Sequence, residues 1–248
     1  MKFAPLISAC AIASGFFVTP LQAAPRTFQG DGISFTYDDT IVSAPKPRHE
    51  AAVPDGDASD KTDGVCPAHW AIDFAEDRRH VWVMPTTDPV VKSFRKAYPR
   101  NDQGQRDLRA LLKKRPSDPK EGPVLPFPDI GVAFITKVRY IDFRSGSGMV
   151  WLTQWINEAD AINNEELWYV FQSLTKDGAH YVSGEVRVKH PSLPEKADVS
   201  KAAKFSKAYD AYLRKAVPEL AKLPDETFHP SLARLRAMFE SIEVKRVP

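Results

Sequence analysis

MVWLTQWI at residues 149–156 and LWYVFQSLT at residues 167–175 decide the fold, because both read as β-strands. Successive side chains of a strand point to opposite faces, so Trp151 and Trp155 share one face while Val150 and its alternate neighbours share the other. A strand that is apolar on both faces must be covered on both. We therefore expect these strands to lie at the centre of the molecule.

Two further strand-like segments, residues 132–143 and 179–189, extend this pair. SGSG at 145–148 and DG at 177–178 provide the turns, and Asp-Gly between apolar runs is a strong hairpin signal. The pattern predicts a continuous antiparallel meander over residues 132–189.

Shorter elements flank the meander. Alternation predicts a strand at 32–37, and two strands at 70–75 and 80–84 are expected to form a hairpin. Apolar residues at helical spacing predict the helices. These helices are a stretch at 88–98, a short helix around Leu108 to Leu112, a long helix at 195–217 and a last helix opening at Pro230. The predicted fold class is α+β, a mostly antiparallel sheet with helices packed on both faces.

Two segments have a loop-like composition. Residues 43–64 are rich in Pro, Asp, Ala and Lys, so we expect a mobile surface loop there. Residues 116–128 carry five prolines, which favours an extended connector. No interdomain linker is evident, and we expect a single domain over residues 24–248.

The N-terminus has the pattern of a secretory signal peptide at residues 1–23. Lys2 precedes an apolar run, and small residues follow it, with cleavage expected after Ala23. A lipid anchor at Cys10 is the less favoured alternative, because only nine residues precede that cysteine. No other apolar stretch approaches the ~20 residues that cross a bilayer. The predicted location is the periplasm or the extracellular space.

Composition limits the remaining possibilities. The sequence has 34 basic and 32 acidic residues, and their near balance gives no support to a nucleic-acid partner. Cleavage would leave Cys66 as the single cysteine, either a buried apolar filler, which we favour, or a free thiol.

No pattern of catalytic or metal-binding residues emerges. The six histidines lie at scattered positions, without the spacing of a zinc site, so we expect no metal. Ser147 lies between two strands rather than at a strand-to-helix turn, and a tight turn explains it better than a nucleophile does. Glycine-rich phosphate loops are also missing from the sequence, and we expect no cofactor.

Gln154 and Gln172 fall in the central strands, where desolvation would demand hydrogen-bond partners. The favoured interpretation is a buried pair in which the two amides satisfy each other. The alternative is a ligand pocket lined by these amides together with Trp151 and Tyr181.

Asn163 and Asn164 lie between the two central strands. We expect a turn with Asn in the left-handed conformation, and a ligand contact is the alternative. The basic residues between Lys196 and Lys215 are interpreted as a solvated helix face, with an anionic cell-wall polymer or lipid headgroups as the alternative partner.

Several short motifs resemble those of a family of uncharacterised bacterial secreted proteins and lipoproteins. They are Gly146-Ser147-Gly148, Thr153-Gln154, Ile162-Asn163-Asn164, Phe171-Gln172, Asp177-Gly178, Tyr181-Val182-Ser183 and His190-Pro191-Ser192-Leu193-Pro194. The resemblance spans about a quarter of the chain and implies no catalytic residue. The order of elements is also similar to the αβα sandwich of PsbP, the extrinsic photosystem subunit, an analogy of fold alone.

The leading hypothesis is an exported, non-catalytic protein that binds a protein partner or a small molecule through one sheet edge or the loop at residues 43–64. One alternative is a hydrolase assembled from distant residues such as Asp142, His180, Ser183 and His190. The other is an accessory subunit of an envelope assembly, with the loop and the Pro-rich connector as docking segments.

Overall fold

The computed structural model describes residues 24–30, 32–39, 44–53, 66–74, 80–87, 91–92, 99–119, 131–156, 159–197 and 208–245. The predicted signal peptide, its cleavage site and Cys10 lie outside these residues. So do most of the helix expected at 88–98 and the second half of the Pro-rich connector.

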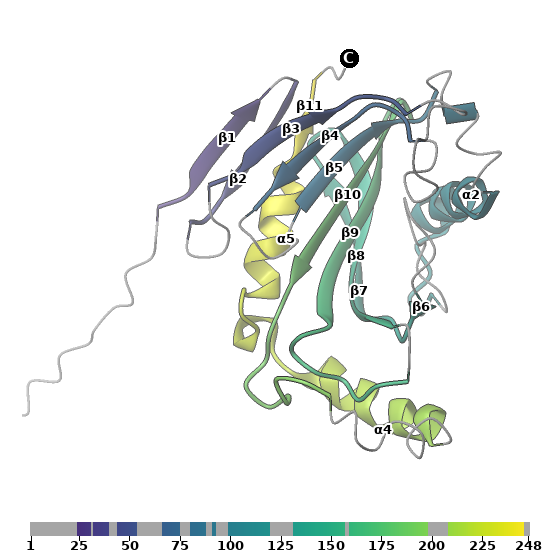
Figure 1. The fold of residues 1–248 in the computed structure, drawn as a ribbon, viewed down its shortest axis with the longest axis vertical. Coiled ribbons are helices and arrows are strands. Elements are labelled where there is room, and N and C mark those ends of the chain that lie inside the picture. The colour runs from purple at the N-terminus through teal and green to yellow at the C-terminus, as the bar shows by residue number, and fades with distance from the viewer. Residues whose placement is uncertain are drawn as a thin grey trace, which may run out of the picture.

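The fold is α+β with a mostly antiparallel sheet, as the sequence predicts. Its main sheet has eight strands in the order β3-β4-β5-β10-β9-β8-β6, with β7 also paired to β8 (Figure 1). The strands are β3 (Lys46–Glu50), β4 (His69–Asp73), β5 (His80–Pro85), β6 (Gly131–Val132), β7 (Thr136–Phe143), β8 (Gly146–Ile156), β9 (Leu167–Thr175) and β10 (His180–Arg187). The continuous antiparallel layer predicted for residues 132–189 is confirmed.

The hairpin between β9 and β10 forms as its Asp-Gly sequence predicts. Gly178 has a φ of 68°, a conformation that costs glycine little. Asp177 Oδ1 accepts hydrogen bonds from Thr175 Oγ1 at 2.6 Å and from the Ala179 amide at 2.9 Å. These bonds fix the turn and therefore the register of the two strands.

Strand β9 is the centre of the sheet, and all nine of its residues are buried. Its side chains divide between two apolar clusters on opposite faces. The first cluster contains Val150, Leu152, Tyr169 and Phe171 together with residues of α5 (Leu232–Glu240). A Cβ at Gly184 would lie 2.6 Å from Phe239, so this glycine permits the close approach of α5.

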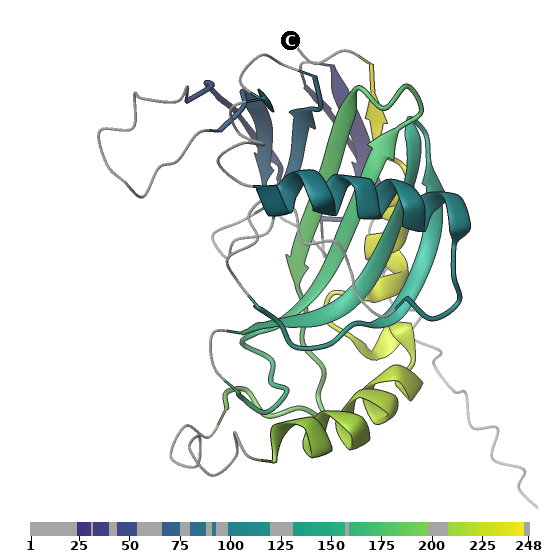
Figure 2. The same ribbon diagram turned by 90° about the vertical axis from the view of Figure 1, so that its right-hand side faces the viewer.

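The second cluster includes Met149, Trp151, Trp168, Val170, Leu174 and Tyr181. Leu108 of α2 (Pro99–Lys114) belongs to it and is fully buried. Figure 2 shows α2 crossing the strands on this side of the sheet. The helix is longer than the short one that the sequence predicts around Leu108.

A three-stranded sheet, β1-β2-β11, joins the two ends of the described chain. The predicted strand at 32–37 is β2 (Ile33–Tyr37), and its alternate residues pack into the first cluster. Its neighbours β1 (Arg26–Gly30) and β11 (Glu243–Val244) are not predicted from the sequence. The apolar pattern of these two short strands is weak. They form because they hydrogen-bond to β2.

Three predictions need correction. Residues 46–50 of the expected loop form β3, because pairing with β4 supplies hydrogen bonds that the local composition does not reveal. The helix expected at 195–217 begins only at Tyr209, as α4 (Tyr209–Lys222), and it continues past Pro218. Its final turn buries Leu220, which favours the extra length. Cys66 is only partly buried, although burial raises the pKa of its thiol to about 11.

Residues 195–197 are instead held near the loop between β8 and β9. The Glu165 amide donates to the Glu195 carbonyl at 3.0 Å, and a 3-10 turn, η2 (Asp225–Thr227), follows α4.

Candidate functional site

The six residues that the sequence predicts as ligand contacts separate into two groups. Gln154, Asn163 and Asn164 lie at and beyond the end of β8, whereas Trp151, Gln172 and Tyr181 lie on the face of the sheet toward α2. The two groups differ in how their polar atoms are satisfied.

The first group is a hydrogen-bond network that holds the loop between β8 and β9. Gln154 Oε1 accepts the Asn163 amide at 3.2 Å, and Asn163 Oδ1 accepts the amides of Glu165 and Glu166 at 2.9 and 3.1 Å. Among the described non-glycine residues, positive φ angles occur at Arg115 and Lys137. The left-handed Asn turn expected here therefore does not form.

Asn164 ties this loop to the chain that follows β10. Its Oδ1 accepts the His190 amide at 2.8 Å, and its Nδ2 donates to the carbonyls of His190 and Leu193. Both polar atoms of the Asn164 side chain therefore form hydrogen bonds with main-chain groups. The hydrogen bonds of Asn163 and Asn164 therefore explain both residues by a structural role in this loop.

The predicted pairing between Gln154 and Gln172 is wrong. In the register of β8 and β9, Gln154 lies opposite Leu167, whereas Gln172 lies opposite Met149. Five residues along one strand correspond to about 17 Å. The sequence reveals that both amides are buried, but the register keeps them apart.

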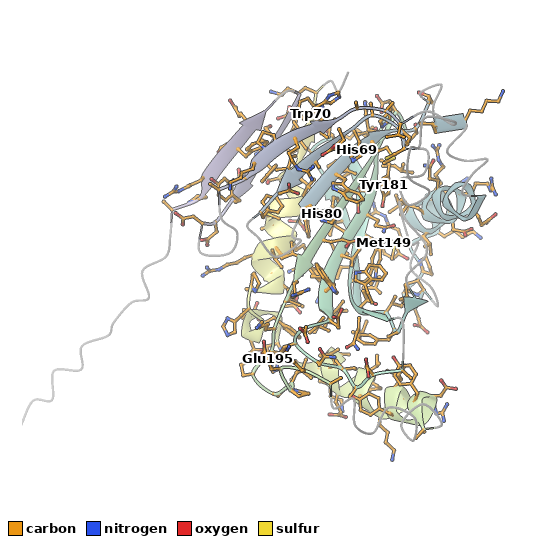
Figure 3. The ribbon with its side chains drawn as sticks, viewed as in Figure 1. His69, Trp70, His80, Met149, Tyr181 and Glu195 are labelled. Carbon is orange, nitrogen blue, oxygen red and sulfur yellow. The ribbon has the colours of Figure 1, made fainter. Side chains whose placement is uncertain are left out.

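The second group belongs to a larger set on the α2 side of the sheet. Directly opposed residues of antiparallel strands share a face, so Gln172 shares this face with Ser183, and Trp168 shares it with Arg187. Alternation along β10 adds Glu185. We call this set the polar face. It comprises Trp151, Trp168, Gln172, Tyr181, Ser183, Glu185 and Arg187. Figure 3 shows Tyr181 and Met149 on the side of the sheet toward α2.

Three donors of the polar face are buried and have no hydrogen-bond partner among the described residues. They are Trp151 Nε1, Trp168 Nε1 and Arg187 Nε. The Tyr181 hydroxyl, in contrast, hydrogen-bonds to the Ser183 side chain. A buried donor left unsatisfied costs about 1–3 kcal/mol. Three such donors on one face make it the candidate site.

The charged groups of the polar face have unusual surroundings. The Arg187 guanidinium lies 4.9 Å from the centre of the Trp168 ring, a cation–π contact. Burial raises the pKa of Glu185 from 4.5 to about 7, so this carboxyl group changes charge near neutral pH. Burial also holds the pKa of the Tyr181 phenol well above its ordinary value, and the phenol stays neutral.

Aromatic side chains extend this face onto β5. His80 lies opposite Glu185, and its ring stacks on Trp82 with the ring centres 4.4 Å apart. Trp82 in turn lies opposite Ser183. The face therefore places hydrogen-bond donors beside flat aromatic rings.

The four residues of the hydrolase alternative have other surroundings. Asp142 is exposed and forms an ion pair with Arg115. His190 Nδ1 and Nε2 lie 2.7 Å from Ser192 Oγ and 2.9 Å from Thr227 Oγ1. Ser183 faces α2, and alternation places His180 on the opposite face. In the part of the chain that the structure describes, none of the four hydrogen-bonds to another.

Sequence reasoning missed three members of the polar face as site residues, Trp168, Glu185 and Arg187, and named Ser183 only for the hydrolase alternative. A signal for Glu185 and Arg187 exists, because polar residues alternate along β10 from Ser183 to Arg187 while Gly184 and Val186 lie between them. Alternation of this kind in a central strand indicates a polar interior face. Trp168 carries no such signal, since an apolar neighbourhood explains it equally well.

Comparison with known proteins gives no matching family model and no matching curated protein. Within the described residues, no three His, Cys, Asp or Glu side chains gather as metal ligands. No helix of the same residues has the length and apolar character needed to cross a bilayer.

Proposed function

We propose that this chain is an exported, non-catalytic binding protein of the bacterial periplasm or cell surface, and that the polar face binds a small molecule. The single observation that supports the binding is the set of three buried donors on one face without hydrogen-bond partners among the described residues. Export rests on the sequence of residues 1–23. Membership of the secreted-protein and lipoprotein family rests on the motifs quoted above.

The chemistry of the polar face favours a ligand with a flat ring and oxygen acceptors. Both indole N–H groups and Arg187 Nε–H can only donate, whereas the Tyr181 and Ser183 hydroxyls can do either. With Glu185 protonated, the remaining charge is that of Arg187. An aromatic carboxylate satisfies these groups best, because its ring packs on tryptophan while its oxygens accept from the donors.

We also propose the finer architecture, an αβα sandwich of the PsbP type. The separate contacts of α2 and α5 with the two clusters support it.

Extraction of co-purified molecules tests the binding. Residues 24–248 are purified without denaturant, and small molecules released by unfolding are identified by mass spectrometry. Benzoate and phenylacetate are then titrated, with the binding followed by tryptophan fluorescence. We expect saturable binding that weakens about tenfold in Ser183→Ala, the loss of one hydrogen bond of about 1.4 kcal/mol.

Ser173→Ala is the matched control, because Ser173 is equally buried on the same sheet but donates to the Val182 carbonyl at 2.9 Å. Its binding should equal that of the unaltered chain. Absence of both a co-purified molecule and saturable binding would rule out the proposed ligand class. Equal weakening in both serine variants would mean that the polar face is not the site.

A further inference from the structure

A second site lies beyond the polar face, at the end of α2. A cavity of about 650 Å³ opens between the C-terminal half of α2, the turn between β7 and β8, and the end of β9. Its apolar floor includes Leu112, Phe143 and Leu174. None of the residues that form the polar face lines this cavity.

Four basic side chains from separate parts of the chain line the cavity. Arg109 and Lys113 are four residues apart and share one face of α2, Arg115 follows the helix, and Lys176 lies in the turn between β9 and β10. One carboxylate, Asp142, also lines it and pairs with Arg115. Four positive charges and one negative charge leave an excess of three.

The basic groups converge although they repel one another. A Cβ at Gly178 would lie 3.5 Å from Arg109 Nη1, so the guanidinium reaches the turn that carries Lys176. Neither Arg109, Lys113 nor Lys176 has an acidic partner among the described residues. Like charges held together in this way are stabilised by an anion.

The lining also contains a hydroxyl donor and a tightly constrained backbone. Ser147 lines the cavity with the basic groups, whereas the Thr175 hydroxyl already donates to Asp177 Oδ1. A Cβ at Gly146 would lie 2.0 Å from the Leu174 carbonyl oxygen, so the chain needs glycine at this wall of the cavity. A site that combines guanidinium groups, ammonium groups and a hydroxyl donor is suited to phosphate.

We propose that this cavity binds a phosphate group. The phosphate belongs either to a small soluble ester or to the headgroup of a phospholipid, and the apolar floor packs against the part next to the phosphate. This site is independent of the proposed function of the polar face.

The test uses residues 24–248 and two probes at physiological ionic strength. Glycerol 3-phosphate is titrated and followed by amide NMR signals of Gly146, Ser147 and Gly178. Vesicles of phosphatidylglycerol and of phosphatidylcholine are tested by cosedimentation.

The variant is the double substitution Lys113→Glu and Lys176→Glu, and both positions are exposed. The control, Lys215→Glu with Lys222→Glu, makes the same change of net charge on α4, where both residues are also exposed.

We expect saturable shifts with glycerol 3-phosphate that weaken at least tenfold in the Lys113/Lys176 variant and are unchanged in the control. Binding to phosphatidylglycerol vesicles alone, with the same dependence on the variants, would identify a lipid as the source of the phosphate. Equal loss in variant and control would mean attraction by overall charge and would overturn the proposal. Failure of both probes to bind the unaltered chain would also overturn it.

Discussion

The loop between β8 and β9 and the polar face of the main sheet both bury polar side chains, but they satisfy them differently. In the loop, the amides of Gln154, Asn163 and Asn164 bond to main-chain groups. On the polar face, indole and guanidinium groups are desolvated without a partner among the described residues. The contrast separates polar residues that stabilise the fold from polar residues available to bind another molecule.

Removal of an amide from the loop should give the largest effect. Asn164→Ala leaves the His190 amide and the Leu193 carbonyl without the Asn164 side chain, while the His190 carbonyl keeps the Leu193 amide. We therefore expect the free energy of unfolding to fall by about 3 kcal/mol. Urea denaturation of the variant measures this change. Asn164→Asp keeps the acceptor for the His190 amide and should lose less. A loss below about 1 kcal/mol in Asn164→Ala would remove the contrast between the two regions.

The carboxyl group of the polar face should give a pH dependence. The pKa of Glu185 is raised from 4.5 to about 7 in the folded chain, so the folded state holds this proton more tightly than the unfolded state. The free-energy cost of burying the charged Glu185 carboxylate is absent below pH 4.5 and fully present above about pH 7. Stability should therefore fall as pH rises through this window, by up to roughly 3 kcal/mol.

Glu185→Gln removes this titration. Denaturant midpoints measured from pH 4 to pH 8 should fall less in the variant than in the unaltered chain, and the variant should be the more stable one at pH 8. Parallel profiles would show that Glu185 is not desolvated in solution.

The smallest effect concerns two serines. Both Ser183 and Ser173 are fully buried; Ser173 donates to the Val182 carbonyl, whereas Ser183 hydrogen-bonds to the Tyr181 hydroxyl. Each change to alanine removes one hydrogen bond and should cost about 1 kcal/mol in the ligand-free chain. Thermal unfolding of the two variants compares them directly. A neutral or stabilising Ser183→Ala would show that the bond between Ser183 and Tyr181 does not form in solution.

Sequence patterns predicted much of the central sheet because its signals are local. Alternation and the Asp-Gly turn define β9 and β10, and burial of Gln154 and Gln172 follows from their apolar neighbours. The pairing of β5 with β10 and the addition of β3 to the edge are long-range contacts. No local pattern encodes these contacts, so the order of the strands outside the meander could not be predicted.

Part of the candidate site was predicted in the same way. Trp151, Gln172 and Tyr181 were named from the sequence and share the polar face, whereas Gln154, Asn163 and Asn164 serve the loop. Arg187 was missed because its relation to Trp168 depends on the register between two strands. A strand segment shows which of its residues share a face but does not show what lies opposite them.

The sequence by itself determined that residues 132–189 form antiparallel strands that are apolar on both sides, since side-chain alternation and turn residues act over a few positions. Only the tertiary structure decided which buried polar atoms find partners. A hydrogen bond requires two groups within about 3 Å, and for residues far apart in the chain that distance is set by strand order, register and the helices packed above.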